Sequence, residues 1–352
     1  MVTIADVARR AGVSTATVSH VLNNTRSVRA ETRAAVLAAV DETSYTPNTV
    51  ARSLATRRTM TLGLVLSALT NPYFGDLLSA AESAAAADGY TLLVVDPHED
   101  PEYEHTVVTR LHHHRVDGIV LAPSAQPEAA LGYLAQHEVP TVLLDRFAEE
   151  GPAAGLDQIG SECLEATATL CRHLVEHGHT RIALVAGLPG LSTTEERRAG
   201  FVRALTEAGI ERDPALEVSG ESATEPARAA MAALLAAPRP PTAVVVGNNS
   251  MTIGVMRAVR DAGVRVPADL ALVAFDDFAW ADLFEPRLTV MAQPFDRIAT
   301  EAIRLLQRRR ARPDATPEAL RLPPALVLRA SCGCSPTPEV AGTPATTGRW
   351  TS

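Results

Sequence analysis

The polar side chains best placed for chemistry in this sequence follow short apolar runs. They stand at residues 71–74, 145 and 146, 157, 192–197, 248 and 249, and 276 and 277. If the runs are parallel strands, these side chains meet beyond the carboxyl ends of a sheet, where ligands bind in such folds. Their aromatic, carboxylate, guanidinium and amide groups suit a polyhydroxyl ligand, because each polar group can make paired hydrogen bonds to vicinal hydroxyls.

Catalysis is a second interpretation of the same residues, since Asp276 and Asp277 could act as general acid and base. No G-x-S-x-G motif accompanies them. All 32 basic residues are arginine, which excludes a P-loop, a Schiff-base lysine and a Ser-x-x-Lys site. We therefore predict no catalytic site and no cofactor.

Histidines and cysteines also give no clear metal motif. His112, His113 and His114 are consecutive, so on a helix they point in different directions. His177 and His179 precede an apolar run, where capping of a helix is the simpler role. The four cysteines, at 163, 171, 332 and 334, match neither a zinc ribbon nor a paired disulfide framework. We predict no metal site and four reduced thiols.

The candidate ligand residues require strands to position them. Between residues 61 and 331 the chain alternates β-branched runs with stretches of helical period; the runs are LGLVLSAL, TLLVVD, GIVLAP, PTVLLD, RIALVAG, ALEVSG, AVVVGN and LALVAFDD. This alternation predicts an α/β fold of parallel sheets with helices on both faces, and two sets of about four strands predict two lobes. Lobe one is expected at about 61–157 and 290–319, and lobe two at about 158–289 and 320–334. Residues 335–352, rich in Pro, Thr and Gly, are expected to be disordered.

A different pattern occupies residues 1–46. Thr3 and Asp6 have capping-box spacing, Gly12 can end a first helix, and Ser14 can cap a second. Residues 31–42 repeat apolar positions at helical spacing and would close a three-helix head. The second helix would then present small, hydrogen-bonding side chains that can enter a major groove and reach base edges, namely Thr15, Ala16, Thr17, Ser19 and His20.

The string TIADVA, then AGVS, then TVSHVLN resembles the head of the LacI/GalR family of bacterial transcription regulators. Within that family the head is most similar to the purine repressors. The resemblance implies a helix-turn-helix head, a hinge helix at residues 47–60 and a type I periplasmic-binding-protein body at 61–334. It also implies contacts to double-stranded operator DNA from Thr3, Ser14, Asn23, Arg26, Tyr45, Asn48, Ala51 and Leu54, with Leu54 entering a minor-groove step.

The resemblance further implies a small-molecule effector between the lobes. The expected effector-binding residues are Tyr73, Phe74, Asp145, Arg146, Asp157, Thr193, Arg197, Asn248 and Asp276. Leu191 stands where purine-binding members have an arginine, and Ser222 falls near the position of their stacking aromatic. These two departures favour a sugar over a purine. A homodimer is expected rather than a tetramer joined by a coiled coil, because no long heptad run follows residue 331.

Charge is divided unevenly along the chain. The formal charge is +4 through Met60 and −13 beyond it, for a total of −9. DNA contact should therefore be confined to the head, and DNA affinity should fall with salt. No export signal or long apolar run is evident, so we expect a cytoplasmic protein without a membrane span. A solute-binding protein or a sugar-processing α/β enzyme with the same body are the alternatives; the first requires an export signal, and the second requires turnover.

Overall fold

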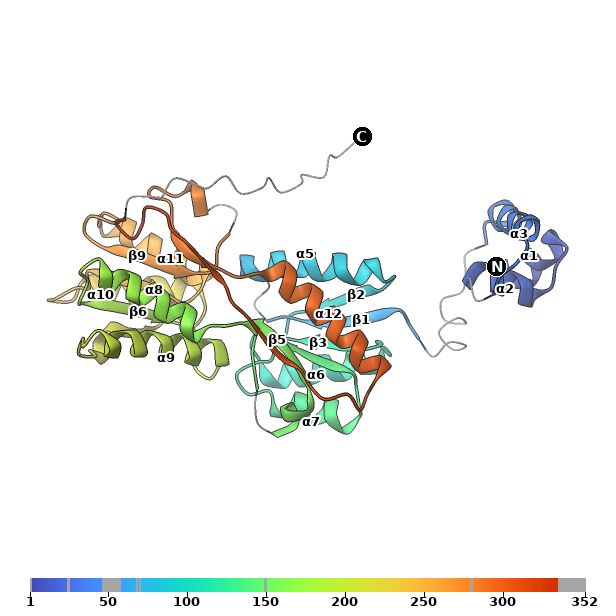
Figure 1. Ribbon diagram of the computed structural model, residues 1–352, viewed down its shortest axis with the longest axis horizontal. Coiled ribbons are helices and arrows are strands. Elements are labelled where there is room, and N and C mark those ends of the chain that lie inside the picture. Colours follow the sequence, from blue (N-terminus) through green and yellow to red (C-terminus); the bar gives the residue numbers. More distant parts are fainter. Residues whose placement is uncertain are drawn as a thin grey trace. The chain divides into compact units, whose positions relative to one another are not determined.

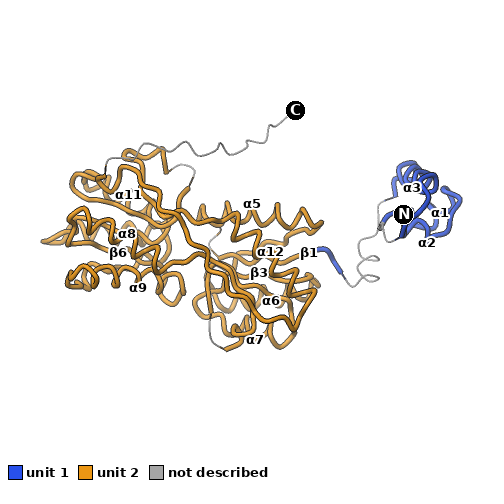
Figure 2. The backbone as a smooth tube through the Cα atoms, in the orientation of Figure 1, with its two compact units in different colours: residues 1–60 blue, residues 61–352 orange. Residues whose placement is uncertain are grey.

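The computed structural model describes residues 2–23, 26–45, 58–67, 69, 71–148, 151–278 and 281–334 (Figure 1). They belong to two compact units, residues 1–60 and 61–352 (Figure 2). Most of the predicted hinge region lies outside the described residues, and so do Asn48, Ala51 and Leu54. The tail predicted at 335–352 lies outside them as well.

The head contains α1 (Ile4–Ala11), α2 (Thr15–Asn23) and α3 (Ala30–Thr43). The predicted capping box is present, because the Thr3 side chain accepts from the Asp6 N–H and the Asp6 carboxylate accepts from the Thr3 N–H. Gly12 ends α1 with φ of 68°, a left-handed conformation that favours glycine. The Ser14 hydroxyl caps α2 by accepting from the Thr17 N–H at 3.1 Å. These helices enclose a small core of Val7, Ala8, Val18, Val21, Val36 and Ala39.

Lobe one of the second unit is built on a six-stranded parallel sheet. In spatial order its strands are β11 (Ala319–Leu322), β5 (Asp157–Ser161), β4 (Thr141–Leu144), β3 (Ile119–Leu121), β1 (Thr61–Val65) and β2 (Thr91–Val95). One face packs against α5 (Pro72–Ala87) and α12 (Phe295–Ala311). The other packs against α6 (Pro101–His113), α7 (Glu128–Gln136) and the short 3-10 helix η1 (Gly151–Gly155).

Lobe two repeats this plan. Its sheet has the order β12 (Ala325–Val327), β10 (Thr289–Ala292), β9 (Ala271–Phe275), β8 (Ala243–Val246), β6 (Ile182–Ala186) and β7 (Glu217–Ser219), with only β12 antiparallel to its described neighbour. Helices α8 (Leu164–Glu176) and α9 (Ser192–Glu207) cover one face, and α10 (Thr224–Leu235) and α11 (Asn249–Asp261) cover the other. Two 3-10 helices, η2 (Pro214–Leu216) and η3 (Ala281–Leu283), complete the lobe.

The predicted α/β fold with two lobes and parallel sheets is confirmed, but the predicted boundaries between the lobes were wrong. The chain crosses from lobe one after β5, returns after β10, and leaves again after β11 (Figure 1). Val290 of β10 pairs with Ala274 of β9 and Val327 of β12, so β10 belongs to lobe two. A four-residue apolar run carries no information about which of two sheets it joins.

The prediction of four reduced thiols was also wrong. Cys332 and Cys334 form a disulfide across one intervening residue, whereas Cys163 and Cys171 are buried free thiols. Close approach of these two sulfurs depends on the turn that follows β12, which the spacing of the cysteines did not reveal. Among the described helices, none is long and apolar enough to cross a membrane.

Close helix crossings make one glycine of lobe two sensitive to substitution. A Cβ added at Gly200 of α9 would lie 2.1 Å from the carbonyl oxygen of Leu164. Gly200→Ala should therefore lower the free energy of unfolding by at least about 1–3 kcal/mol through overpacking. Gly132→Ala in α7 is the control, because nothing lies within 4 Å of its added Cβ. This substitution should raise the free energy of unfolding by up to about 1 kcal/mol, since alanine favours a helix over glycine. Urea unfolding measures both, and a Gly200→Ala protein as stable as Gly132→Ala would contradict the packing.

Candidate effector pocket and DNA-reading surface

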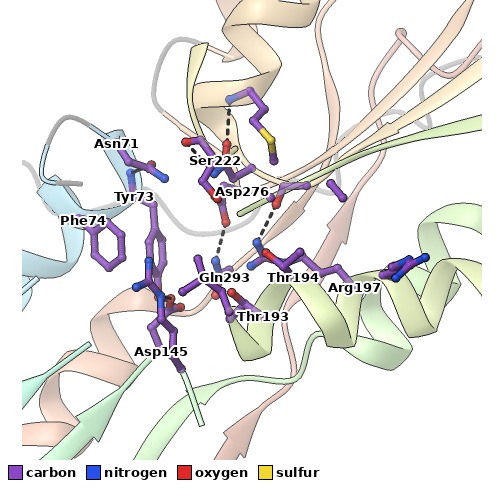
Figure 3. Close-up of a pocket in the computed structure, with 18 of the residues that line it drawn as sticks. Asn71, Tyr73, Phe74, Asp145, Thr193, Thr194, Arg197, Ser222, Asp276 and Gln293 are labelled. Atoms are coloured by element: carbon purple, nitrogen blue, oxygen red, sulfur yellow. Dashed lines mark hydrogen bonds and ion pairs between the residues drawn. The ribbon is translucent and has the colours of Figure 1, made fainter. Parts of the chain in front are cut away.

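A pocket lies between the lobes of the second unit, at the carboxyl ends of strands from both sheets (Figure 3). Eight of the nine residues predicted to bind an effector line it: Tyr73, Phe74, Asp145, Arg146, Thr193, Arg197, Asn248 and Asp276. Asn71, Glu99, Leu191, Thr194, Ser222 and Gln293 also line it. The structure therefore brings the predicted residues together, while their binding of an effector stays a prediction.

Two helix N-termini aim side chains at this pocket. Asn71 caps α5 by accepting from the Tyr73 N–H at 3.0 Å, and the N-terminal Pro72 suits the first turn. This cap fixes Tyr73 and Phe74, whose rings meet edge to face with centroids 5.1 Å apart. Asn248 caps α11 in the same way by accepting from the Met251 N–H at 2.8 Å. Each amide thus has its oxygen committed to a helix.

Two buried carboxylates, one from each lobe, dominate the chemistry of the pocket. Asp145 follows β4 with φ of 66°, and Asp276 follows β9 with φ of 76°. Aspartate tolerates this left-handed conformation better than most residues, but it still costs about 1–3 kcal/mol per residue and is concentrated at functional sites. Tyr73 donates its hydroxyl to Asp145 at 3.1 Å, and the Gln293 amide donates to Asp276. Burial raises the pKa of both carboxyls.

Arg197 of α9 is the guanidinium that faces this pair. Its Nη1 donates to the carbonyl oxygen of Gly247 at 2.7 Å, and its Cζ lies 3.9 Å above the Phe275 ring. Burial disfavours its charge, yet nearby Cys163, Asp276 and Asp145 raise its pKa. Its buried Nε has no hydrogen-bond partner in the part of the chain that the structure describes. A ligand hydroxyl could accept from that N–H.

Arg146 lines the pocket but is held by other groups. Its two terminal nitrogens donate to the Glu99 carboxylate at 2.9 and 2.6 Å, and Nη1 also donates to Pro123 O at 2.8 Å. The nearest contact to Asp145 is 4.0 Å, from Nε. We therefore interpret Arg146 as a group that orients the wall of the pocket and balances its charge.

Asp157 is the predicted effector residue that the structure places elsewhere. It begins β5, whereas the other candidates follow strands. It therefore lies at the amino ends of the strands, opposite the carboxyl ends where a ligand binds. Its fully buried carboxylate pairs with Arg308 at 3.2 Å and Arg309 at 2.8 Å, and accepts from the Glu318 N–H at 2.8 Å. Asp157 therefore holds α12 and β11 to the sheet, and its assignment to the effector was wrong.

Gln293 is a pocket residue that the sequence interpretation missed. It follows β10 directly, so it obeys the same rule that found Asp145 and Asp276. The rule was applied to the eight runs named in the sequence analysis, and β10 was not among them. Glu99 was missed for a different reason, since it follows β2 by four residues and reaches the pocket through its pair with Arg146.

In the head, α2 presents the predicted base-reading surface. Thr15 and Ala16 are exposed, and Thr17, Ser19 and His20 are partly exposed. Ser14 and Thr17 share a hydroxyl–hydroxyl bond of 2.9 Å, and the Thr3 hydroxyl donates to Asp6 at 2.7 Å. Arg26 is exposed, Tyr45 packs against the head core, and Asn23 ends α2. Ser14 and Thr3 thus have capping roles independent of DNA.

Comparison with known proteins assigns both units. A family model described as bacterial regulatory proteins, lacI family, matches residues 3–48, and one described as a periplasmic binding protein-like domain matches residues 171–332. The transcriptional repressor PurR of Erwinia tasmaniensis is 36% identical over 337 residues, which cover 96% of this chain and 98% of that protein. PurR of Yersinia pestis is 35% identical over the same shares. The chain belongs to the lacI family. It is a DNA-binding transcriptional repressor with this family's two-lobed body.

Solved structures of this family have the same fold. The lac repressor dimer bound to operator and the anti-inducer ONPF matches with a TM-score of 0.84 and 30% identity, covering 94% of this chain and 99% of that one. The complex of the regulator CelR with cellobiose matches with a TM-score of 0.72 and 29% identity, covering 94% and 100%. Both matches include the head as well as the body of this lacI-family chain.

The raised pKa of Asp145 makes stability depend on pH in a defined direction. A carboxyl whose pKa is higher in the folded state binds more protons there, so the free energy of unfolding falls as pH rises through that pKa. Asp145→Asn removes the titrating carboxyl, and with it this pH dependence, but keeps an oxygen that can accept a hydrogen bond from Tyr73. At pH 7 it should therefore raise the stability of the ligand-free protein by about 1 kcal/mol, and the gain should shrink on acidification.

Urea unfolding between pH 4 and pH 8 tests this expectation. The exposed Asp314 provides the control, since Asp314→Asn changes charge without changing the pocket. A ligand-free Asp145→Asn protein that is less stable than the native chain at pH 7 would show that the carboxylate stabilises the fold.

Proposed function

We propose that this repressor binds a sugar or related polyol in the pocket between its lobes, and that the ligand controls its affinity for operator DNA. The observation that carries the proposal is the convergence of Asp145, Asp276 and Arg197 beside the ring of Phe74. Each charged group can bond two neighbouring hydroxyls at once, and an aromatic face suits the apolar face of a sugar ring. Two buried carboxylates facing one guanidinium favour a neutral ligand rich in donors.

The pocket offers less to a purine. Leu191 and Ser222 both line it, and they stand where purine-binding members of the family are expected to have an arginine and a stacking aromatic. The structural relative solved with cellobiose supports a sugar, whereas the 36% identity to PurR favours a purine as the second candidate. Calorimetric titration against a panel of sugars and nucleobases distinguishes the two. Tight purine binding without any sugar binding would overturn the assignment.

The dimer that we propose uses lobe one. Strand β2 lies at the edge of its sheet and exposes Leu93 and Val94 at 39% and 37%. Exposed apolar side chains on an edge strand favour contact with another chain. The lac repressor relative was solved as a dimer on operator DNA. Two-fold symmetry of a dimer then requires a pseudo-palindromic operator.

Coupling between the pocket and DNA follows from the predicted hinge. We propose that residues 50–55 of this hinge form a short helix only when two copies lie close together on DNA, since a helix of about two turns is marginal alone. A ligand that binds more tightly at one angle between the lobes would change the fraction of molecules in which the hinge helix is folded. A coupling of about 1–3 kcal/mol would change DNA affinity about 5- to 150-fold.

Base reading by the head is tested at His20. His20→Ala should lower operator affinity by about 5- to 150-fold, since a good contact to a base edge contributes about 1–3 kcal/mol. Affinity for random DNA of equal length should stay nearly unchanged, because phosphate contacts supply it. Operator from a random-pool selection serves as the probe in fluorescence anisotropy. Equal losses on operator and random DNA would show that His20 does not read sequence.

Ligand control is tested at Arg197. Arg197→Gln should abolish the change in operator affinity caused by the tightest-binding panel ligand, while operator affinity without ligand stays within about threefold of the native value. Arg203→Gln on the same helix is the control, because Arg203 pairs at the surface with Glu165 and Glu207. An undiminished ligand response in Arg197→Gln would place the regulatory site outside this pocket.

A further inference from the structure

A second cluster of potential ligand atoms lies in lobe two, at the C-terminal end of α8. His173 and His177 are one helical turn apart, with ring centroids separated by 4.4 Å. Cys334, in the segment after β12, places its Sγ 3.5 Å from Nε2 of His173. One ligand atom from each of the three residues lies within 4.8 Å of the others. None of these residues lines the effector pocket.

The separation of His173 and Cys334 fits a tetrahedral metal ion. Zinc holds imidazole nitrogen at about 2.0–2.1 Å and thiolate sulfur at about 2.3 Å, which places a nitrogen and a sulfur ligand about 3.5 Å apart. This is the separation observed between His173 and Cys334. His177 is exposed, so a small shift of its ring can bring Nε2 to the ion without disturbing the core.

A further hydrogen bond prepares His177 for this role. Its Nδ1 donates to the carbonyl oxygen of His173 at 2.7 Å. The proton is thereby fixed on Nδ1, and the lone pair of Nε2 is left for a ligand. Metal-binding histidines characteristically donate their other ring N–H to such an acceptor.

The sulfur ligand is masked by the Cys332–Cys334 disulfide. We propose that reduction of this disulfide opens a site for a divalent ion of the zinc type, held by His173, His177 and Cys334. A dithiol can carry out this reduction: it supplies two electrons and two protons and itself becomes a disulfide, while the S–S bond breaks to give two thiols. Metal binding then releases the Cys334 thiol proton, because only the thiolate is a ligand.

Metal binding and disulfide formation are mutually exclusive at this site, because both use the sulfur of Cys334. Cys332 is 1% exposed and stays in the core, where the Thr289 hydroxyl lies 3.1 Å from its sulfur. Three protein ligands leave a fourth position on the metal for water. The bound ion would tie the segment after β12 to α8 and stabilise lobe two only in the reduced protein.

Cobalt(II) is the probe for this site, because its thiolate complexes absorb by charge transfer. The full chain without an affinity tag is reduced with a phosphine, or oxidised, and titrated with Co²⁺, and Zn²⁺ is added to compete. We expect one Co²⁺ per reduced chain with a thiolate charge-transfer band that Zn²⁺ abolishes, and no such band in the oxidised chain. Alkylation under denaturing conditions followed by mass spectrometry should label four cysteines in the reduced chain and two in the oxidised one.

Two variants and a matched control assign the ligands. Cys334→Ser should remove the charge-transfer band, and His177→Ala should weaken Co²⁺ binding at least tenfold. His179→Ala should leave binding unchanged, because the His179 ring contacts the Thr242 hydroxyl instead. Absence of the band in the reduced native chain, or native affinity in His177→Ala, overturns the site. Equal Co²⁺ binding with the disulfide intact overturns its redox control.

Discussion

Two buried carboxylates that face each other across a cleft constrain the whole body of this repressor. Asp145 and Asp276 each stand at a strand end in a left-handed conformation, and each belongs to a different lobe. Burial raises the pKa of each carboxyl and so disfavours its charged form. Tyr73 donates a hydrogen bond to Asp145, and Gln293 donates one to Asp276. Arg197 relieves both charges. The strand ends of both sheets and the caps of α5 and α11 place the other pocket residues around this pair.

The distribution of charge separates the two tasks of the chain. The head is small and basic, and it has its own core of six buried apolar residues. This core positions α2 without packing contacts from the body. The acidic body repels a polyanion and places its functional residues in a cleft instead. Long-range electrostatics alone would act on all DNA sequences alike, so the ligand control that we propose requires a structural coupling between the two units.

Local signals in the sequence predicted more than nonlocal ones. The capping box at Thr3 and Asp6 and the glycine at Gly12 depend on residues within one turn, and the structure confirms both. The strand-end rule placed eight predicted residues in one pocket. It failed at Asp157, which begins its strand. It was not applied to Gln293, because β10 was not among the runs to which the rule was applied. Which sheet β10 joins depends on residues far away in the sequence, and this misplaced the boundary between the lobes. The Cys332–Cys334 disulfide likewise depends on a turn that spacing alone does not specify.

The most direct test of ligand control is calorimetric titration of the full-length protein with its tightest panel ligand, with and without saturating operator DNA. Linkage requires the operator to change ligand affinity by the same factor by which the ligand changes operator affinity. We predict a change of about 5- to 150-fold, which corresponds to a coupling of about 1–3 kcal/mol. Identical ligand affinity with and without operator would contradict the account, because the pocket and the head would then act independently.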